Sequence, residues 1–171
     1  MNFLEQLAAE WYEYSGYFVR TNIKFGPRAR GGYFGEIDVV GYKSETREFI
    51  HVETSTDSDS WKKREVKFKR KFSTARRHYM EVFRFKDVDI RPIQIAIVGF
   101  NLKPSDKTKS WKSSPPTGSL YGKIKIEVIH IPKFLHDIYE KLKDKDPQKD
   151  AIPESYPLLR AIQYSAFYNK K

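Results

Sequence analysis

Two segments with the alternation of half-buried strands organise this chain: Phe34-Gly35-Glu36-Ile37-Asp38-Val39-Val40 and Phe49-Ile50-His51-Val52-Glu53-Thr54-Ser55. They are separated by a short polar segment that includes Lys43-Ser44-Glu45-Thr46, which favours an antiparallel hairpin. If the hairpin turns near residues 44–46, Asp38 lies opposite Glu53 or within one residue of it. The hairpin therefore predicts that two acidic side chains meet across neighbouring strands.

Two carboxylates in these positions need a compensating charge. Directly opposed side chains of an antiparallel pair have Cβ atoms roughly 4.5–5.5 Å apart, so like charges there destabilise the pair. A cation between Asp38 and Glu53 would remove the repulsion, and carboxylate oxygens suit Mg²⁺ or Mn²⁺. Such a metal polarises a phosphoryl group and lowers the pKa of a bound water. The alternative is that Asp38 projects into solvent or pairs with a lysine.

The remaining pattern predicts a mixed α/β sandwich around one sheet. Helices are expected at residues 3–15, 59–83, 132–143 and 156–168, and strands at 17–25, 33–42, 47–54, 90–100 and 123–131. We expect an α/β domain over residues 1–150, with a basic loop at 101–120. A helical tail at 151–171 then packs on this domain or on a partner, and a two-fold contact in a homodimer is one form of the second arrangement.

Composition limits the class of protein. The 171 residues include 12 Phe, 11 Tyr and 3 Trp, which is enough aromatic surface for one ordered core. The chain contains no cysteine, so disulfides, thiolate metal sites and a cysteine nucleophile are excluded. The net charge of +10 favours polyanionic partners, with nucleic acid ahead of an anionic membrane surface.

The cellular location and the need for a cofactor are inferred from features that the sequence lacks. It has no apolar run long enough for a membrane span, and its first residues show no basic-then-apolar leader. Together with the absence of cysteine, this predicts a cytoplasmic protein. We expect no organic cofactor.

A third acid lies on the first predicted helix. Glu5 stands beside the apolar residues Phe3 and Leu4, and a helix packed on the sheet would aim it at the same metal. Glu10 competes with Glu5 for this role, and either acid could equally be an ordinary surface residue.

Order and spacing of these motifs resemble the PD-(D/E)XK nuclease superfamily, particularly its Mrr-like and Holliday-junction-resolvase-like branches. The matching pieces, which span about residues 3–83, are Glu5 on a helix ending at Gly16-Tyr17, Gly35-Glu36-Ile37-Asp38, Val52-Glu53-Thr54-Ser55, and then Lys71-Phe72, Ala75 and Tyr79 on the long helix. The resemblance implies a restriction-endonuclease-like three-layer sandwich, with a mixed central sheet flanked by helices. It also implies that Asp38 and Glu53 are metal ligands and that Glu5 is an auxiliary acid.

One position departs from the superfamily pattern. The resemblance places a lysine two residues after Glu53, and this chain has Ser55 there. Serine cannot supply the positive charge that stabilises a pentacovalent phosphate. We expect Lys71 to substitute from the long helix, with Lys67 as the second choice; otherwise activity is weak or lost. His51 shares the strand face of Glu53 and is interpreted as a hydrogen-bonded strand histidine rather than a ligand.

Basic residues gather in three places that are candidates for contact with nucleic acid. A phosphate backbone would supply the counter-charge that an almost wholly basic helix lacks. Trp111, within the basic loop, could stack on an unpaired base or cover its own loop. The candidate residues are Arg28 and Arg30 in the glycine-rich loop, Lys62, Lys63, Lys67, Lys69 and Arg70 on the long helix, and Trp111.

These features predict a Mg²⁺- or Mn²⁺-dependent endonuclease that hydrolyses phosphodiester bonds in DNA, with Glu5, Asp38, Glu53 and Lys71 at the catalytic site. Two other interpretations remain open. One is a nucleic-acid-binding protein of the same fold whose chemistry has lapsed because Ser55 stands in place of lysine. The other is a protein-interaction subunit that uses the aromatic residues of the tail.

Overall fold

In a computed structural model of the chain, six strands of the described residues (2–83, 92–99, 110–113 and 124–169) form one mixed sheet in the order β1-β2-β3-β4-β6-β5. The strands are β1 (Phe18–Pro27), β2 (Tyr33–Lys43), β3 (Glu48–Ser55), β4 (Pro92–Val98), β5 (Trp111–Ser113) and β6 (Ile124–His130). Strands β1, β2 and β3 form an antiparallel meander, β3, β4 and β6 run parallel, and β5 pairs antiparallel with β6.

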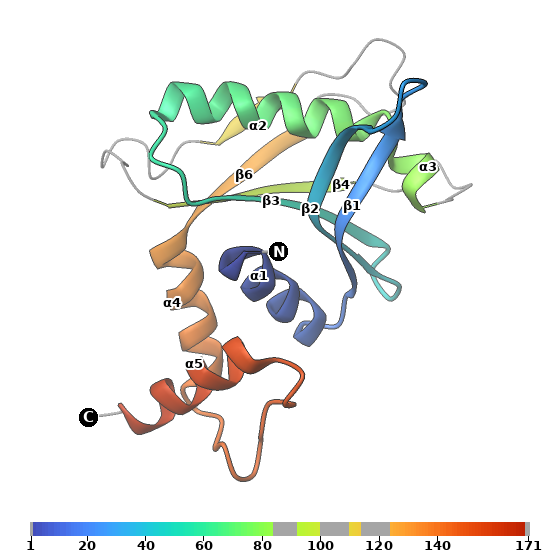
Figure 1. The fold of residues 1–171 in the computed structure, drawn as a ribbon. Coiled ribbons are helices and arrows are strands. Elements are labelled where there is room, and N and C mark those ends of the chain that lie inside the picture. The colour runs from blue at the N-terminus through green and yellow to red at the C-terminus, as the bar shows by residue number, and fades with distance from the viewer. Residues whose placement is uncertain (1, 84–91, 100–109, 114–123, 170–171) are drawn as a thin grey trace.

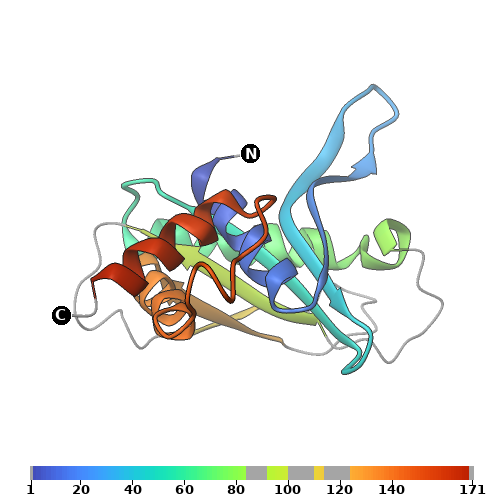
Figure 2. The same ribbon diagram turned by 90° about the horizontal axis from the view of Figure 1, so that it is seen from below.

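Helices cover both faces of the sheet. They are α1 (Phe3–Tyr14), α2 (Trp61–Arg76), α3 (Tyr79–Phe83), α4 (Ile131–Leu142) and α5 (Pro157–Tyr168). Figure 1 shows α2 lying across one face and α1 and α4 lying on the other, with α5 outside them. Figure 2 shows the face that carries α1, α4 and α5, and the β1–β2 hairpin projecting beyond the layers. The predicted α/β sandwich with a mixed sheet flanked by helices is confirmed at this level.

Local sequence explains where the helices begin and end. Asn2 and Glu5 form a reciprocal capping box at the start of α1, in which the Asn2 side chain accepts from the backbone N–H of Glu5 at 3.0 Å. Gly16, with a φ of 89°, follows the end of α1 in a left-handed conformation that suits glycine. Proline occupies the first turn of both α4 and α5, where its missing N–H has no consequence.

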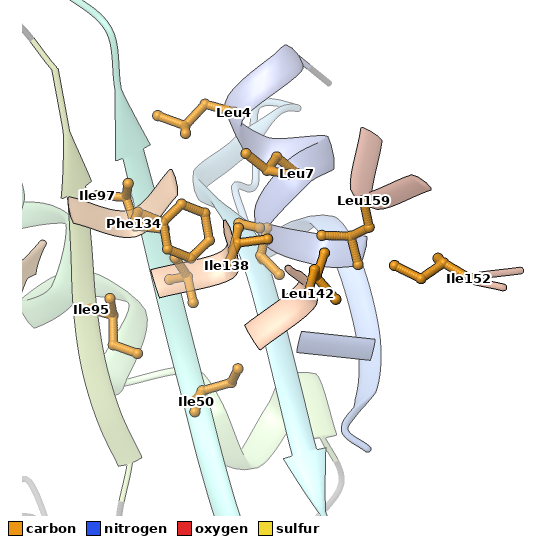
Figure 3. Packing of buried hydrophobic residues seen from close by; sticks show 13 residues of the cluster. Leu4, Leu7, Ile50, Ile95, Ile97, Phe134, Ile138, Leu142, Ile152 and Leu159 are labelled. Atoms are coloured by element: carbon orange, nitrogen blue, oxygen red, sulfur yellow. The ribbon is translucent and has the colours of Figure 1, made fainter. Parts of the chain in front are cut away.

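The largest apolar cluster lies between the sheet and the layer of α1 and α4. Figure 3 shows Leu4 and Leu7 of α1 and Phe134 of α4 pointing toward the same space as Ile97 of β4. Leu159 of α5 also belongs to this cluster. The tail thus packs on the domain in this structure, on α1 and α4.

The other face carries two smaller clusters beneath α2 and α3. One joins Phe25 and Phe49 of the sheet to Ala75 and Tyr79. The second packs Phe68 and Phe72 of α2 against β4, β5 and β6. The two clusters together hold α2 on this face of the sheet.

The element boundaries differ from the predictions in two places. The long helix expected at 59–83 is divided into α2 and α3, and Arg77 and His78 lie between them. The second difference is a short strand, β5, inside the loop expected at 101–120; the rest of that loop, apart from Ser110, lies outside the described residues. Across the described ranges, none of the helices has the length and apolar character needed to cross a bilayer.

Glu10 links the first helix to the last. The residue is 5% exposed, and its carboxylate accepts from the backbone N–H groups of Leu158 at 2.9 Å and Leu159 at 3.0 Å, in the first turn of α5. Free N–H groups at a helix start carry partial positive charge, so a carboxylate there both satisfies and stabilises them.

We expect Glu10→Ala to lower the free energy of unfolding by about 1–3 kcal/mol, because two part-buried donors lose their acceptor. Hydrogen exchange should show the loss of protection concentrated in α5. The matched control is Glu13→Ala, an exposed residue of the same helix, which should change stability by less than about 0.5 kcal/mol. Equal effects of the two variants would contradict the role assigned to Glu10.

Candidate active site

Asp38 and Glu53 lie on the face of the sheet that α2 covers. Strands β2 and β3 pair at Val39↔Val52, so the same register places residue 38 opposite residue 53, as the hairpin pattern predicted. The backbone N–H of Thr54 donates to Oδ2 of Asp38 at 2.8 Å, which fixes one oxygen of that carboxylate. The other oxygen faces α2.

Strand β1, which neighbours β2, is distorted next to Asp38. Strand β1 pairs with β2 at Thr21↔Val39 and Ile23↔Ile37, and Asn22 between them has a φ of 54°. Asparagine adopts this left-handed conformation more readily than most residues. The local kink lies directly across from Asp38, so the ladder is irregular where the candidate site is built.

Lys71 of α2 joins the two acids. Its Nζ lies 3.2 Å from Oδ1 of Asp38 and in direct contact with Oε2 of Glu53. The Glu53 side chain is fully buried, the Asp38 side chain is 12% exposed, and the Lys71 side chain is 32% exposed. The lysine thus forms the solvent side of the cluster, where a ligand would meet it first. Lys71, the first-choice substitute for the missing motif lysine, reaches the acids as expected.

Electrostatics in the cluster reflect burial and crowding. Burial, together with the nearby charge of Asp38, raises the pKa of the Glu53 carboxyl group well above its ordinary value. Burial alone would lower the pKa of Lys71, but the carboxylates of Glu53 and Asp38 raise it instead. Lys71 is therefore positively charged at neutral pH. Its charge offsets part of the repulsion between the carboxyl groups of Asp38 and Glu53.

A chain of hydrogen bonds lies behind Glu53. His51 is fully buried, with Nε2 2.8 Å from Oε1 of Glu53 and Nδ1 2.5 Å from the hydroxyl of Tyr79. The amide of Gln94 donates to the same hydroxyl at 3.3 Å. Burial lowers the pKa of His51 to about 3, which keeps the ring neutral. In a neutral ring the tautomer with its proton on Nε2 donates to Glu53 and accepts from Tyr79 at Nδ1. His51 thus donates to Glu53 and orients it, in agreement with its interpretation as a hydrogen-bonded strand histidine.

Ser55 does not enter this cluster. Its hydroxyl donates to Asp57, whose carboxylate also accepts from Lys67 at 2.8 Å and from Nε of Arg64 at 3.0 Å. Arg64 is fully buried, and its guanidinium also donates to the backbone carbonyl of Asp57. Lys67, the second-choice substitute, is therefore engaged with Asp57 rather than with the two acids. The Asp57 cluster fixes the start of α2 to the end of β3.

Glu5 is not brought to the cluster, which corrects the expectation of an auxiliary acid. Its carboxylate accepts from the backbone N–H of Asn2 at 2.9 Å and from the Asn2 amide at 2.5 Å, on a helix that packs on the opposite face of the sheet from α2. Glu10, the competing candidate, caps α5 instead. Among the residues that the structure describes, no group of three or more His, Asp or Glu side chains is placed to hold a metal.

The basic residues of α2 divide into paired and exposed sets. Arg64 and Arg76 are buried, and Lys69 pairs with Glu65 within the helix. The exposed basic residues of the predicted surface are Arg28 and Arg30 in the loop and Lys62, Lys63 and Arg70 on α2.

Trp111 corrects another expectation. It is 3% exposed, and its ring packs against Trp61 at 4.9 Å and Phe68 at 5.4 Å between ring centroids. A ring enclosed in this way is not available to stack on a base. The structure places the ring in the apolar cluster beneath α2, with Phe68 and Phe72.

Two functional features were not anticipated from the sequence. One is the contact between Tyr79 and His51, since Tyr79 was identified only as a matching position on the long helix. A polar hydroxyl on a buried helix face was the available signal. The other is Asp57, an acid just before a helix that is otherwise almost wholly basic, and this imbalance of charge was the signal.

We expect Asp57→Asn to lower the free energy of unfolding by about 2–4 kcal/mol at pH 7, because the buried Arg64 loses its charged partner. Burial would raise the pKa of Asp57, but hydrogen bonds from Lys67, Ser55 and Arg64 hold it below its ordinary value of 3.8. The stabilisation is therefore complete above that value and is lost as the pH falls below it. Urea unfolding from pH 7 to pH 2 should show the two proteins converging in acid.

The control for this variant is Glu65→Gln, which removes a half-exposed pair with Lys69. A pair of this kind contributes about 0.3–0.5 kcal/mol, so the control should remain close to the wild-type protein. A difference between wild type and Asp57→Asn that grows in acid would refute the linkage.

Comparison with known proteins adds little to this geometry. No protein-family model matches the sequence, and no curated protein matches it. A crystal structure titled as a protein of unknown function, AF1548, superposes with a TM-score of 0.45 at 12% sequence identity, covering 96% of this chain and 95% of that one. A likeness at this level carries no argument about activity, so the chemistry rests on the residues of the cluster.

Proposed function

We propose that this protein is a metal-dependent endonuclease that hydrolyses phosphodiester bonds in DNA. The observation that carries the proposal is the convergence of Asp38, Glu53 and Lys71 at one edge of a basic helix. The order of elements supports a restriction-endonuclease-like assignment: a helix, a three-stranded antiparallel meander, a crossing helix and a parallel fourth strand.

The donor set suits a hard divalent cation. Mg²⁺ is commonly held by one or two carboxylates, while water and substrate phosphate complete its coordination. Asp38 and Glu53 supply two carboxylates whose oxygens already share one cation, the Lys71 ammonium. Burial and the neighbouring charge of Asp38 raise the pKa of Glu53, and this crowding of two carboxyl groups supports the proposal of a further cation here. Mg²⁺ or Mn²⁺ therefore fits these residues, with Asp38 and Glu53 as its protein ligands.

Each residue of the cluster has a distinct task in this proposal. When bound, the ion supplies a Lewis acid that polarises the phosphate and lowers the pKa of a coordinated water. Lys71 brings a fixed positive charge to the solvent side of the cluster, where negative charge develops on the phosphate oxygens. His51 and Tyr79 hold the Glu53 carboxylate in one orientation without contacting the substrate. His51, neutral and fully buried, is a positioning residue in this scheme.

Positioning of the substrate backbone falls to the exposed cations. Lys62, Lys63 and Arg70 lie on the same helix as Lys71, and Arg28 lies on the loop of the neighbouring hairpin. Contacts of this kind give affinity that falls steeply with salt and carry no information about base sequence. We therefore propose DNA as the partner, bound through its phosphates.

A second candidate function is binding without cleavage. The Lys71 ammonium already contacts both carboxyl groups, so the cluster has a counter-charge supplied by the protein itself. In that case the protein binds DNA and the cluster stabilises the fold. Removal of a carboxylate or of the lysine has different effects under the two functions.

Asp38→Asn and Glu53→Gln should each reduce Mg²⁺- or Mn²⁺-dependent cleavage of plasmid DNA by at least about a hundredfold, because each removes a charged oxygen ligand. DNA affinity, measured by fluorescence anisotropy without divalent metal, should be retained. The matched control is Glu5→Gln, which keeps a capping-box side chain and should cleave at the wild-type rate. Undiminished cleavage in both site variants would reject the proposed centre.

Lys71→Met separates the two candidate functions. If the site is a metal centre, Mn²⁺ binding measured by calorimetry should tighten, because the competing ammonium is gone. Cleavage should fall about 10²- to 10³-fold with the loss of the fixed charge. Lys67→Met, one turn earlier and engaged with Asp57, should alter neither measurement. If Lys71→Met binds no Mn²⁺ and only loses stability, the lysine is a structural counter-ion and the binding function is preferred.

A further inference from the structure

A pocket of about 480 Å³ lies beside the candidate active site, between the β1–β2 hairpin and α2. Its lining includes Phe25, Arg28, Phe34, Glu36, Arg70 and Lys71. Lys71 thus belongs to the pocket and to the carboxylate cluster, and Glu36 is two residues from Asp38 on the same strand. The volume falls within the range of about 300–1,000 Å³ that small-molecule sites occupy.

The aromatic wall of the pocket is held in place rather than loose. Phe34 and Phe25 both pack on His78, with ring centroids 6.1 Å and 5.2 Å away. Glycine permits this packing: a Cβ at Gly26 would lie 2.6 Å from the Phe34 ring, and one at Gly35 would lie 2.5 Å from the Phe25 ring. The backbone therefore makes room for both rings.

Phe34 nevertheless remains 57% exposed. A large aromatic ring that is fixed by its neighbours and still open to solvent offers a flat face to a ligand. The guanidinium of Arg28 lies over that ring, 5.2 Å from its centroid, so a base that stacks on this face displaces the guanidinium and keeps a cation beside it. The pocket therefore combines a stacking surface with positive charge.

Charge on the lining selects among ligands. Arg28, Arg70 and Lys71 favour a phosphate, whereas the exposed carboxylate of Glu36 repels one and accepts N–H groups instead. An inorganic phosphate alone would leave the aromatic wall unused and would meet the repulsion of Glu36. A nucleotide satisfies every part of the lining, since its base stacks on Phe34, its base edge donates to Glu36 and its phosphate lies among the cations.

We propose that this pocket takes one unpaired nucleotide of the DNA substrate, and that the protein acts on DNA that carries unpaired bases next to the cleaved phosphate. The inference rests on the proposed function. A base within a duplex has both faces covered by its neighbours, so only an unpaired or extruded base can stack on a protein ring. Because Lys71 borders both sites, the phosphate attached to the bound nucleotide lies beside Asp38 and Glu53.

The test measures binding of two duplexes of the same length by fluorescence anisotropy in EDTA, which keeps binding separate from cleavage. One duplex is perfectly paired, and the other carries a single bulged 2-aminopurine. We expect tighter binding of the bulged duplex and a change in 2-aminopurine fluorescence on binding. Phe34→Ala should weaken binding of the bulged duplex roughly tenfold or more, the effect of removing one base–aromatic stack, and should leave the affinity for the paired duplex unchanged.

Phe18→Ala is the matched control. Phe18 is 75% exposed at the other end of β1, where it pairs with Tyr42, and it is not part of the pocket lining. This variant should bind both duplexes as the wild type does. Phe34→Trp keeps a stacking ring and should restore the preference for the bulge, which separates loss of stacking from loss of folding. Equal affinities of the wild type for the two duplexes, or equal effects of Phe34→Ala and Phe18→Ala, would overturn the inference.

Failure of this inference is distinguishable from failure of the proposed function. Metal-dependent cleavage of paired DNA that needs Asp38 and Glu53, with no preference for the bulge, would leave the nuclease and remove the nucleotide pocket. A preference for the bulge that depends on Phe34, with no cleavage under Mg²⁺ or Mn²⁺, would leave nucleotide binding and remove the nuclease.

Discussion

Two carboxylates on adjacent strands of one sheet face impose the main constraint on this structure, because they require a cation close to both. The Lys71 ammonium meets that requirement from α2, with contacts to Asp38 and Glu53. It can do so only if α2 crosses directly above β2 and β3. The apolar clusters under α2 and α3 hold the helix in that position, and the Asp57–Arg64 pair fixes where it begins. The charge balance of the site therefore depends on the same packing that holds α2 on this face of the sheet.

The local sequence pattern was sufficient to predict much of the sheet and the approach of Asp38 to Glu53. A short polar segment between two alternating runs leaves few registers for a hairpin, and the observed Val39↔Val52 pair belongs to the register expected. This register depends on residues close in sequence and on strict periodicity, and such information is present in a single chain. The resemblance, rather than the helical pattern alone, gave Lys71 its expected place beside the acids, and the structure brings it there from α2.

Features that depend on distant partners were not predictable in the same way. The periodicity of α1 identified its apolar side but not which face of the sheet it would cover, so Glu5 was expected on the wrong side. Trp111 was placed in a loop because its surroundings are polar, but it fills a space between Phe68 and Trp61 that only the folded chain creates. The burial of Arg64 was likewise not predictable, because nothing in a helical pattern reveals an acid partner that lies before the helix, seven residues away. In each case the deciding contact lies outside the local pattern.

The link between Glu10 and the start of α5 has a consequence for how the molecule is made. A chain leaves the ribosome from its N-terminal end, and domains generally fold as they emerge. Here a carboxylate of the first helix remains without the donors of Leu158 and Leu159 until those residues have been synthesised. Leu159 also fills the cluster that Leu4 and Leu7 begin. The large apolar cluster is thus completed only after α5 has been synthesised, and until then part of the apolar surface of α1 lacks its partner.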